Sequence, residues 1–264
     1  MNVIGLTVLK NATKMGYPWV ESILSVLPQC DYFHVSEGYS EDDTWEVLQR
    51  LQECYPDKIS LSRYEWPKME TGFAIGDATN YALSCVRHLG GKILYVQADE
   101  LWHPDSVEEL VRLMRDEEMD YDGYNIPFLH LEHNCQVIQE GAGYQMAIRA
   151  VNNDESITSH RDAWTFEGCQ RPLIVLSIPR KLVHCNYCFW DNVPIKKKVQ
   201  AEELYPDLGH YAYAAEVAEG EWSQEVPDMF LETDSPFIDS LPEVFHPMLG
   251  QRKYFVREEL LQCE

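Results

Sequence analysis

The sequence has no hydrophobic run long enough to span a membrane. No stretch of its 264 residues approaches the roughly 18 consecutive apolar residues of a membrane helix. A secretory leader is not expected either, because residues 1–9 are interrupted by Asn2, Gly5 and Thr7 and lack a preceding basic region. Internal repeats and low-complexity tracts are also missing. These absences predict a soluble globular protein of the cytoplasm.

Basic residues are scarce. The chain carries 21 Lys and Arg residues against 44 Asp and Glu residues, so its formal net charge is −23. Such a charge repels the phosphates of nucleic acids and the anionic face of a membrane. We therefore expect no nucleic acid partner.

The sequence also lacks a dense cysteine framework. Its eight cysteines are scattered singly, apart from Cys185 and Cys188. This usage predicts reduced thiols in an intracellular protein. Because no second pair accompanies Cys185 and Cys188, we expect structural thiols there and not a zinc site.

Strand and helix signals alternate regularly through the first half of the chain. Hydrophobic residues make up 45% and charged residues 25% of the sequence, which is usual for a globular protein. Short apolar runs predict strands over residues 3–9, 32–36, 58–64 and 93–96. Helical spacing predicts helices over residues 18–27, 43–54, 75–89 and 104–114. This order predicts an α/β fold with a mostly parallel central sheet and helices on both faces.

The second half has a different pattern. Residues 120–133 and 143–151 predict two strands that could pair, and shorter strands are expected over residues 174–178 and 182–184. From residue 201 onward the chain holds 15 acidic and 3 basic residues together with several prolines. We expect one domain over residues 1–200 and an acidic C-terminal extension over residues 201–264 packed on it.

The stretch Gln97-Ala98-Asp99-Glu100 ends the fourth predicted strand. Carboxylates at this place face the edge where open α/β sheets bind ligands. Hard divalent cations prefer such oxygen ligands, so Asp99 and Glu100 are candidates for a metal site. Both could instead be helix N-terminal charges stabilised by the helix dipole.

Other polar and aromatic residues allow two interpretations. His130, Glu132 and His133 invite a zinc site, but alternation along a strand separates them, so we expect a surface strand. Tryptophans at 102, 164 and 190 could stack on sugar rings, although core packing is the commoner use of tryptophan.

Five motifs resemble those of one enzyme family. They are residues 36–44, 79–83, 97–103, 152–166 and 184–187. The first three resemble a G-x-S-x-D-x-T loop, a T-N-x-A-L helix start and the Q-A-D-E version of a D-x-D metal motif. The fourth resembles an N-D pair followed by D-A-x-x-F, and the fifth stands where one branch has H-Y-G-W. In this order the motifs resemble the family 2-like glycosyltransferases of the GT-A fold, from about Met1 to Val199.

The resemblance implies a GT-A fold, a nucleoside-diphosphate-sugar donor and a divalent cation, Mn²⁺ or Mg²⁺. A metal and nearby cations would neutralise the charge of the leaving diphosphate. By analogy Asp99 is the main metal ligand, Glu100 lies beside it, and His184 is a second ligand. Gln97 replaces the first Asp of the motif, which leaves fewer charges for the cation.

The resemblance also implies residues that bind the donor and a general base. Carboxylates face the nucleoside and cations pair with phosphates. The donor-binding candidates are Lys10, Glu37, Asp43, Asn80, Gln97, Arg149 and Lys198. An inverting transferase also needs a base for the acceptor hydroxyl, for which Asp162 is the candidate, with Glu140 and Glu155 behind it.

The resemblance therefore implies a metal-dependent, inverting glycosyltransferase. Its donor would be a UDP- or GDP-sugar and its acceptor a glycan or other hydroxyl compound. A nucleotidyltransferase is the enzyme alternative, but it needs a glycine-rich phosphate loop, and residues 9–12 contain no glycine. A non-catalytic nucleotide- or carbohydrate-binding relic of the fold is the other alternative, which Gln97 favours.

Overall fold

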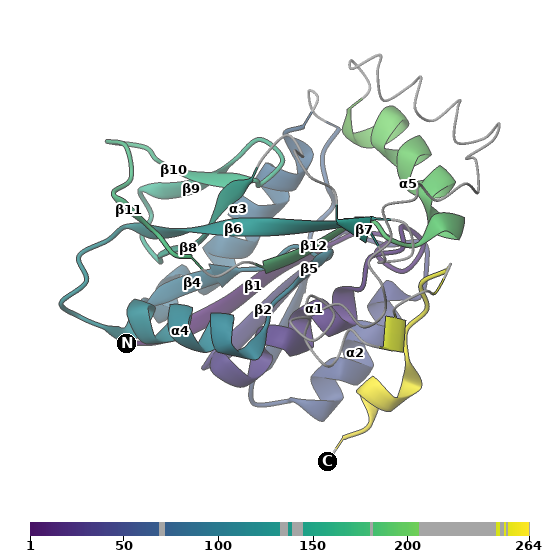
Figure 1. Cartoon of the computed structure of the whole chain (residues 1–264), viewed down its shortest axis with the longest axis horizontal. Helices are drawn as coiled ribbons and strands as arrows, with labels where there is room; N and C mark the ends of the chain where they lie inside the picture. Colours follow the sequence, from purple (N-terminus) through teal and green to yellow (C-terminus); the bar gives the residue numbers. More distant parts are fainter. Residues whose placement is uncertain are drawn as a thin grey trace.

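A mixed β-sheet with helices on both faces forms the core of the protein (Figure 1). The computed structural model describes residues 1–68, 72–132, 137–138, 145–179, 182–205, 247–248, 251 and 253–263. Within these ranges the main sheet has ten strands, and a second sheet has two. None of the described helices is long and apolar enough to cross a membrane.

The first half of the chain follows the predicted alternation. Its elements are β1 (Val3–Leu9), α1 (Trp19–Val26), β2 (Tyr32–Glu37), α2 (Thr44–Cys54), β3 (Ile59–Arg63), α3 (Ala74–Val86), β4 (Lys92–Tyr95) and α4 (Pro104–Arg115). The four strands are parallel and lie in the order β3-β2-β1-β4. The predicted α/β class with a mostly parallel sheet is confirmed.

The second half completes the sheet with mixed pairing. Its elements are β5 (Glu100–Leu101), β6 (Gly123–Glu132), β7 (Val137–Ile138), β8 (Met146–Asn152), β9 (Ile157–His160), β10 (Thr165–Gly168), β11 (Val175–Ser177), β12 (Leu182–Tyr187) and α5 (Val193–Val199). β8 lies antiparallel between β4 and β6, as expected for the two predicted strands that could pair. β12 runs parallel to β6, and the short β5 pairs antiparallel with β12.

Side chains of β1 alternate between two hydrophobic cores. Ile4, Leu6 and Val8 pack in the core under α3, whereas Val3 and Leu9 belong to the core under α1, α2 and α4. This alternation follows from the two-residue period of a strand. The predicted cover of helices on both faces is therefore confirmed (Figure 1).

The strand order reverses between β1 and β4. The chain proceeds from β1 outward to β2 and β3 and then returns to the other side of β1 with β4. Ligands of open α/β sheets bind at such a switch point, outside the carboxyl ends of the strands. The residues that follow β1 and β4, Lys10 and Gln97 to Asp99, lie at this point.

The described C-terminal residues pack on α1. The hydroxyl of Tyr254 donates to Glu21 Oε2 at 3.0 Å, and Arg257 Nε donates to Glu21 Oε1 at 3.2 Å. Met248 and Leu261 are buried in the core under α1 and α2. Most of the predicted acidic extension, residues 206–246, lies outside the described residues, so the predicted division at residue 200 stays a prediction.

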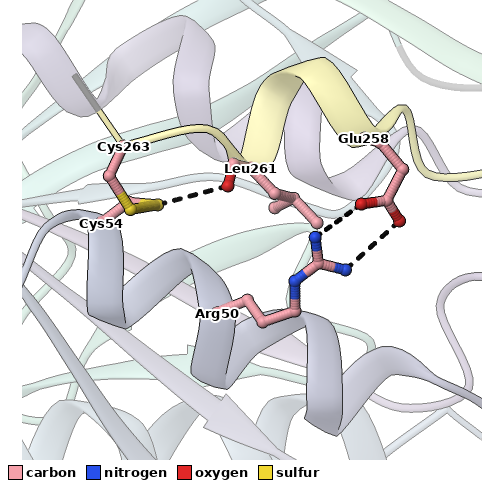
Figure 2. The surroundings of a disulfide bond; sticks show 5 residues. All are labelled: Arg50, Cys54, Glu258, Leu261 and Cys263. Carbon is pink, nitrogen blue, oxygen red and sulfur yellow. Dashed lines mark hydrogen bonds and ion pairs between the residues drawn. A yellow bond between two sulfur atoms is a disulfide. The ribbon is translucent and has the colours of Figure 1, made fainter.

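A disulfide joins Cys54 at the end of α2 to Cys263 (Figure 2). Beside it, Arg50 Nη1 donates to Glu258 Oε1 at 3.2 Å and so joins the same two segments. The expectation of reduced thiols is wrong for this cysteine pair. The two cysteines are 209 residues apart, so their proximity follows from tertiary packing and not from sequence spacing.

A buried histidine makes stability depend on pH. His34 on β2 lies between two serines of β3, with Nδ1 2.7 Å from Ser60 Oγ and Nε2 3.0 Å from Ser62 Oγ. Burial lowers the pKa of His34 from 6.5 to about 4. Above pH 6.5 the imidazole is neutral in both the folded and the unfolded chain. As pH falls from 6.5 toward 4, only the unfolded chain takes up the proton, so stability is lost.

We expect His34→Gln to reduce this acid sensitivity. Linkage predicts that His34 removes about 2 kcal/mol of the free energy of unfolding between pH 7 and pH 5. Urea unfolding of both proteins at pH 7, 6 and 5 measures the difference. Parallel losses of stability in the two proteins would contradict the assignment.

Candidate functional site

A cleft of about 1200 Å³ opens at the carboxyl ends of β1, β2 and β4. The segment of α5 and the π-helical residues that follow it, Gln200–Leu204, lines the opposite wall. Among the predicted site residues, those that line the cleft are Lys10, Gln97, Asp99, Asp162 and His184. The cleft thus brings together predicted site residues from four distant parts of the sequence, since Gln97 and Asp99 belong to one turn.

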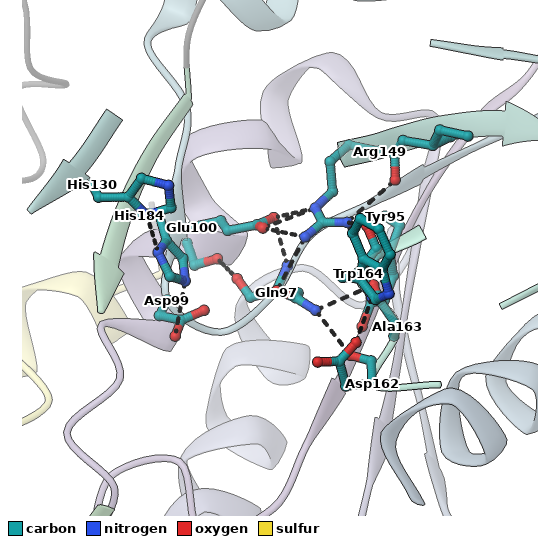
Figure 3. A network of polar contacts seen from close by, with 12 residues as sticks. Tyr95, Gln97, Asp99, Glu100, His130, Arg149, Asp162, Ala163, Trp164 and His184 are labelled. Atoms are coloured by element: carbon teal, nitrogen blue, oxygen red, sulfur yellow. Dashed lines mark hydrogen bonds and ion pairs between the residues drawn. The ribbon is translucent and has the colours of Figure 1, made fainter. Parts of the chain in front are cut away.

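Asp99 lies close to His184 and Lys196. Its Oδ2 is 3.6 Å from His184 Nε2 (Figure 3). The same oxygen is 3.4 Å from Lys196 Nζ, and the Asp99 side chain is only 14% exposed. Burial alone would raise the pKa of Asp99, but the charges of His184 and Lys196 hold it below its usual range. Asp99 therefore carries a negative charge across the physiological pH range.

Strand pairing explains why His184 meets Asp99. The acidic turn, residues 97–100, runs directly into β5, which begins at Glu100 and pairs with β12, so that Glu100 lies opposite His184. The Cys185 amide also donates to the Asp99 carbonyl at 2.7 Å. The two-residue strand β5 escapes pattern analysis because it is too short to show a period.

His130 is buried beside His184, and the prediction of a surface strand at this position is wrong. Its Nδ1 lies 2.9 Å from Nδ1 of His184. His130 pairs in register with His184 on β12, and the two rings are in contact, with their centroids 4.9 Å apart. One of the two Nδ1 atoms must donate to the other, which leaves His184 Nε2 facing Asp99.

Glu100 and Arg149 form a fully buried ion pair. Arg149 Nη2 lies 2.7 Å from Glu100 Oε1, and neither side chain is exposed. The same guanidinium donates to Gln97 Oε1 at 3.1 Å and to the Trp164 carbonyl at 3.0 Å (Figure 3). Glu100 and Arg149 thus contact each other and do not line the cleft. The pair fixes Gln97 and Trp164, which do.

Asp162 lies in the loop between β9 and β10. Its neighbours Arg161 and Ala163 both have a left-handed backbone, with φ of 51° and 60°. The Gly76 amide on α3 donates to the Arg161 carbonyl at 2.7 Å, and a Cβ at Gly76 would lie only 2.2 Å from that oxygen. Burial raises the pKa of Asp162 above its usual value. A raised pKa suits a carboxylate that accepts a proton.

One segment contacts three of the predicted site residues. Lys196 on α5 pairs with Asp99, as described above. Further along, Glu203 Oε2 lies 3.6 Å from Lys10 Nζ, and the Tyr205 hydroxyl donates to Asp162 Oδ2 at 3.4 Å. Residues 196–205 therefore contact Asp99 after β4, Lys10 after β1 and Asp162 in the β9–β10 loop.

Aromatic side chains line both ends of the cleft. At the β1–β2 end lie Tyr39 and Trp66, the latter with Lys10 Nζ 6.0 Å from its ring centroid. A Cβ at Gly38 would lie 2.8 Å from Trp66 Nε1, so only glycine leaves room for this indole. At the other end Trp164, 39% exposed, lies next to Asp162. Trp102, in contrast, is a core residue.

The remaining predicted donor residues do not line the cleft. Glu37 is buried, and its carboxylate accepts hydrogen bonds from the Ser40 amide and from Arg63 Nε, the latter at 2.7 Å. Asn80 is paired with the Ser159 backbone. Asp43, Glu155 and Lys198 are exposed and do not line the cleft. Glu140 lies outside the described residues.

The sequence analysis names Lys198 as a donor-binding candidate, whereas the lysine of α5 that lines the cleft is Lys196. Val193 and Lys196 are both buried on α5, three residues apart, whereas Lys198 is exposed. Helical spacing from Val193 is thus the signal that could have selected Lys196. The sequence analysis considered His130 only as part of a zinc site with Glu132 and His133, and no pattern in the sequence distinguished Tyr205.

The charged groups around Asp99 fit a divalent cation only together with a phosphorylated ligand. In the described part of the chain no three His, Cys, Asp or Glu side chains gather as a metal site. Asp99 and His184 could supply two ligands. Magnesium-type ions are often held by one or two carboxylates plus substrate phosphates, so a bound diphosphate would complete the set.

Comparisons with known proteins find remote structural likeness alone. No protein-family model and no curated protein matches the sequence. Solved structures that align with the chain include TarS 1–349 of S. aureus, at 15% identity and a TM-score of 0.45, over 81% of this chain and 69% of that chain. Mannosyltransferase PcManGT of Pyrobaculum calidifontis, in complex with GDP-Man and Mn²⁺, aligns at 13% identity and a TM-score of 0.43, over 94% and 68% of the two chains. At these TM-scores the likeness carries no weight for function.

We expect Arg149→Met to destabilise the protein strongly. The change leaves the buried Glu100 carboxylate without its partner, which typically costs about 3–5 kcal/mol of the free energy of unfolding. Urea unfolding measures the loss, with Arg171→Met as a control because Arg171 forms an exposed pair with Asp122. The control is expected to lose much less. The double variant Arg149→Met/Glu100→Gln should recover part of the loss, and no recovery would contradict the explanation.

Proposed function

We propose that the protein is a glycosyltransferase that moves a sugar from a nucleoside-diphosphate-sugar donor to a hydroxyl acceptor. The observation that carries the proposal is the placement of Asp99, His184 and Lys196 in a cleft at the switch point of the sheet. A nucleotide sugar has an aromatic base, a charged diphosphate and a polar sugar. The cleft is lined by groups suited to each of these parts: the aromatic rings of Tyr39, Trp66 and Trp164, the lysines Lys10 and Lys196, and the carboxylate of Asp162.

The diphosphate would lie between the ends of β1 and β4. Lys10 and Lys196 supply cations there, and Asp99 with His184 would hold Mn²⁺ or Mg²⁺ against the phosphate oxygens. A bound metal would offset the negative charge that builds up on the leaving diphosphate. Tyr39 and Trp66 would contact the base, and Glu37 would act indirectly by holding the adjacent loop through Ser40 and Arg63.

Asp162 would act as the general base. The acceptor oxygen attacks the anomeric carbon while its proton passes to the Asp162 carboxylate, and the bond from that carbon to the diphosphate oxygen breaks. Attack from the face opposite the leaving group inverts the anomeric centre. The raised pKa of Asp162 and its place beside Trp164 support this role. The Tyr205 hydroxyl donates a hydrogen bond to Oδ2 of this carboxylate at 3.4 Å.

The loop after β1 argues against the nucleotidyltransferase alternative. A phosphate loop presents free backbone amides to the phosphates. Here the Asn11 amide donates to Ser40 Oγ at 2.7 Å, and the Ala12 amide donates to Thr44 Oγ1 at 3.1 Å. These amides are engaged within the protein, so we do not favour that function.

We expect one nucleoside diphosphate sugar to raise the melting temperature, and to do so more strongly with Mn²⁺. Binding to the folded state alone stabilises it by RT ln(1 + [L]/Kd). A thermal-shift panel of UDP-, GDP-, CMP- and dTDP-sugars with Mn²⁺ or with EDTA identifies the donor. Asp99→Asn should remove the effect of Mn²⁺, whereas Asp57→Asn, an exposed aspartate outside the cleft, should retain it. No shift with any donor would refute the proposal.

We expect Asp162→Asn to lower kcat by about 10²- to 10⁴-fold, because general base catalysis contributes that much. The donor should still shift the melting temperature of this variant as it shifts that of the wild type. Product formation with the donor from the panel and a set of sugar acceptors measures the loss. A fall in donor binding with kcat unchanged would assign Asp162 to the donor and not to the acceptor.

A further inference from the structure

Lys196 is unusual among the cations of the cleft because it is almost completely buried. Its side chain is 5% exposed, and its ammonium lies 3.4 Å from Asp99 Oδ2 and 4.5 Å from the ring centroid of Tyr17. A buried ammonium loses its hydration and needs nearby negative charge or aromatic faces in compensation. Asp99 and Tyr17 provide both. The lysine is therefore built into the site and is not a solvated surface charge.

A metal at Asp99 would have to share this carboxylate with Lys196. Divalent cations bind carboxylate oxygens at a little over 2 Å. Lys196 Nζ already lies close to Oδ2, the carboxylate oxygen that also faces His184 Nε2. A doubly charged ion held by this oxygen and by His184 would lie close to the ammonium. Repulsion between the two cations would oppose metal binding unless further negative charge were present.

We propose that Lys196 competes with the divalent cation for Asp99, so that the metal binds only together with the diphosphate of the donor. The inference deepens the proposed function and rests on it for the identity of the diphosphate. In the free protein Lys196 neutralises Asp99. With a donor bound, its diphosphate would add negative charge, Asp99 and His184 would hold the cation, and Lys196 would pair with a phosphate oxygen. Lys196 is thus a positioning residue that makes metal binding depend on the donor.

The burial of Glu100 supports this dependence of metal binding on the donor. Glu100, the second carboxylate of the acidic turn, is fully buried against Arg149 and offers the cation no further charge. Asp99 is therefore the single carboxylate of this turn that lines the cleft. One carboxylate that a lysine already neutralises has little net attraction left for a metal ion.

The test is a titration of the full-length protein with Mn²⁺ alone, in which electron paramagnetic resonance measures the free ion. We expect weak binding by the wild type and at least tenfold tighter binding by Lys196→Met, because Asp99 then lacks its internal cation. Arg112→Met, which removes an exposed cation of α4, should bind Mn²⁺ as the wild type does. The double variant Lys196→Met/Asp99→Asn should lose the gain.

Equal Mn²⁺ affinity in the wild type and Lys196→Met would overturn the inference, and so would a gain that persists in the double variant. If Lys196→Met does not fold, as judged by circular dichroism, Lys196→Gln takes its place in the same titration. A second arm repeats the titration with UDP and GDP, where the wild type should bind Mn²⁺ at least tenfold tighter than without nucleotide. Failure of the second arm alone would refute the proposed donor, whereas failure of the first arm refutes competition at Asp99.

Discussion

The buried ion pair between Arg149 and Glu100 is the interaction on which the site depends. Two fully buried charges are tolerated only when each has several partners, because desolvation of an unpaired ion is expensive. Arg149 meets this condition with the Glu100 carboxylate, the Gln97 side chain and the Trp164 carbonyl. The pair therefore joins β8, the acidic turn after β4 and the loop that carries Asp162.

The same pair explains why the adjacent carboxylates Asp99 and Glu100 have different roles. Asp99 and Glu100 are adjacent and chemically alike, yet one lines the cleft and the other is buried. Asp99 belongs to the turn after β4, whereas Glu100 is the first residue of β5, so the two side chains have different surroundings. The cation that each carboxylate meets then decides its role. Arg149 makes Glu100 structural, whereas Lys196 and His184 leave Asp99 at the cleft surface.

Basic and acidic side chains both line the cleft of this chain, whose formal net charge is −23. Two of its lysines are paired with carboxylates, Lys10 with Glu203 and Lys196 with Asp99. An anionic ligand would therefore compete with these carboxylates for the lysines. The described non-glycine residues with positive φ lie at or beside the cleft, since Asn11 and Tyr39 line it and Arg161 and Ala163 flank Asp162. Strained backbone of this kind concentrates at functional sites.

Periodicity and element order by themselves determined the α/β class, the four parallel strands with their helices, and the pairing of β6 with β8. They also determined that Asp99, at the end of β4, would face the ligand edge, because that edge follows from strand direction alone. Tertiary structure decided what spacing does not encode: the disulfide, the burial of His130, the partner of Glu100, and which lysine of α5 enters the cleft. The reason is physical, since a charged side chain takes its role from the charges it meets across strands β5, β12 and β6, and those neighbours are distant in sequence.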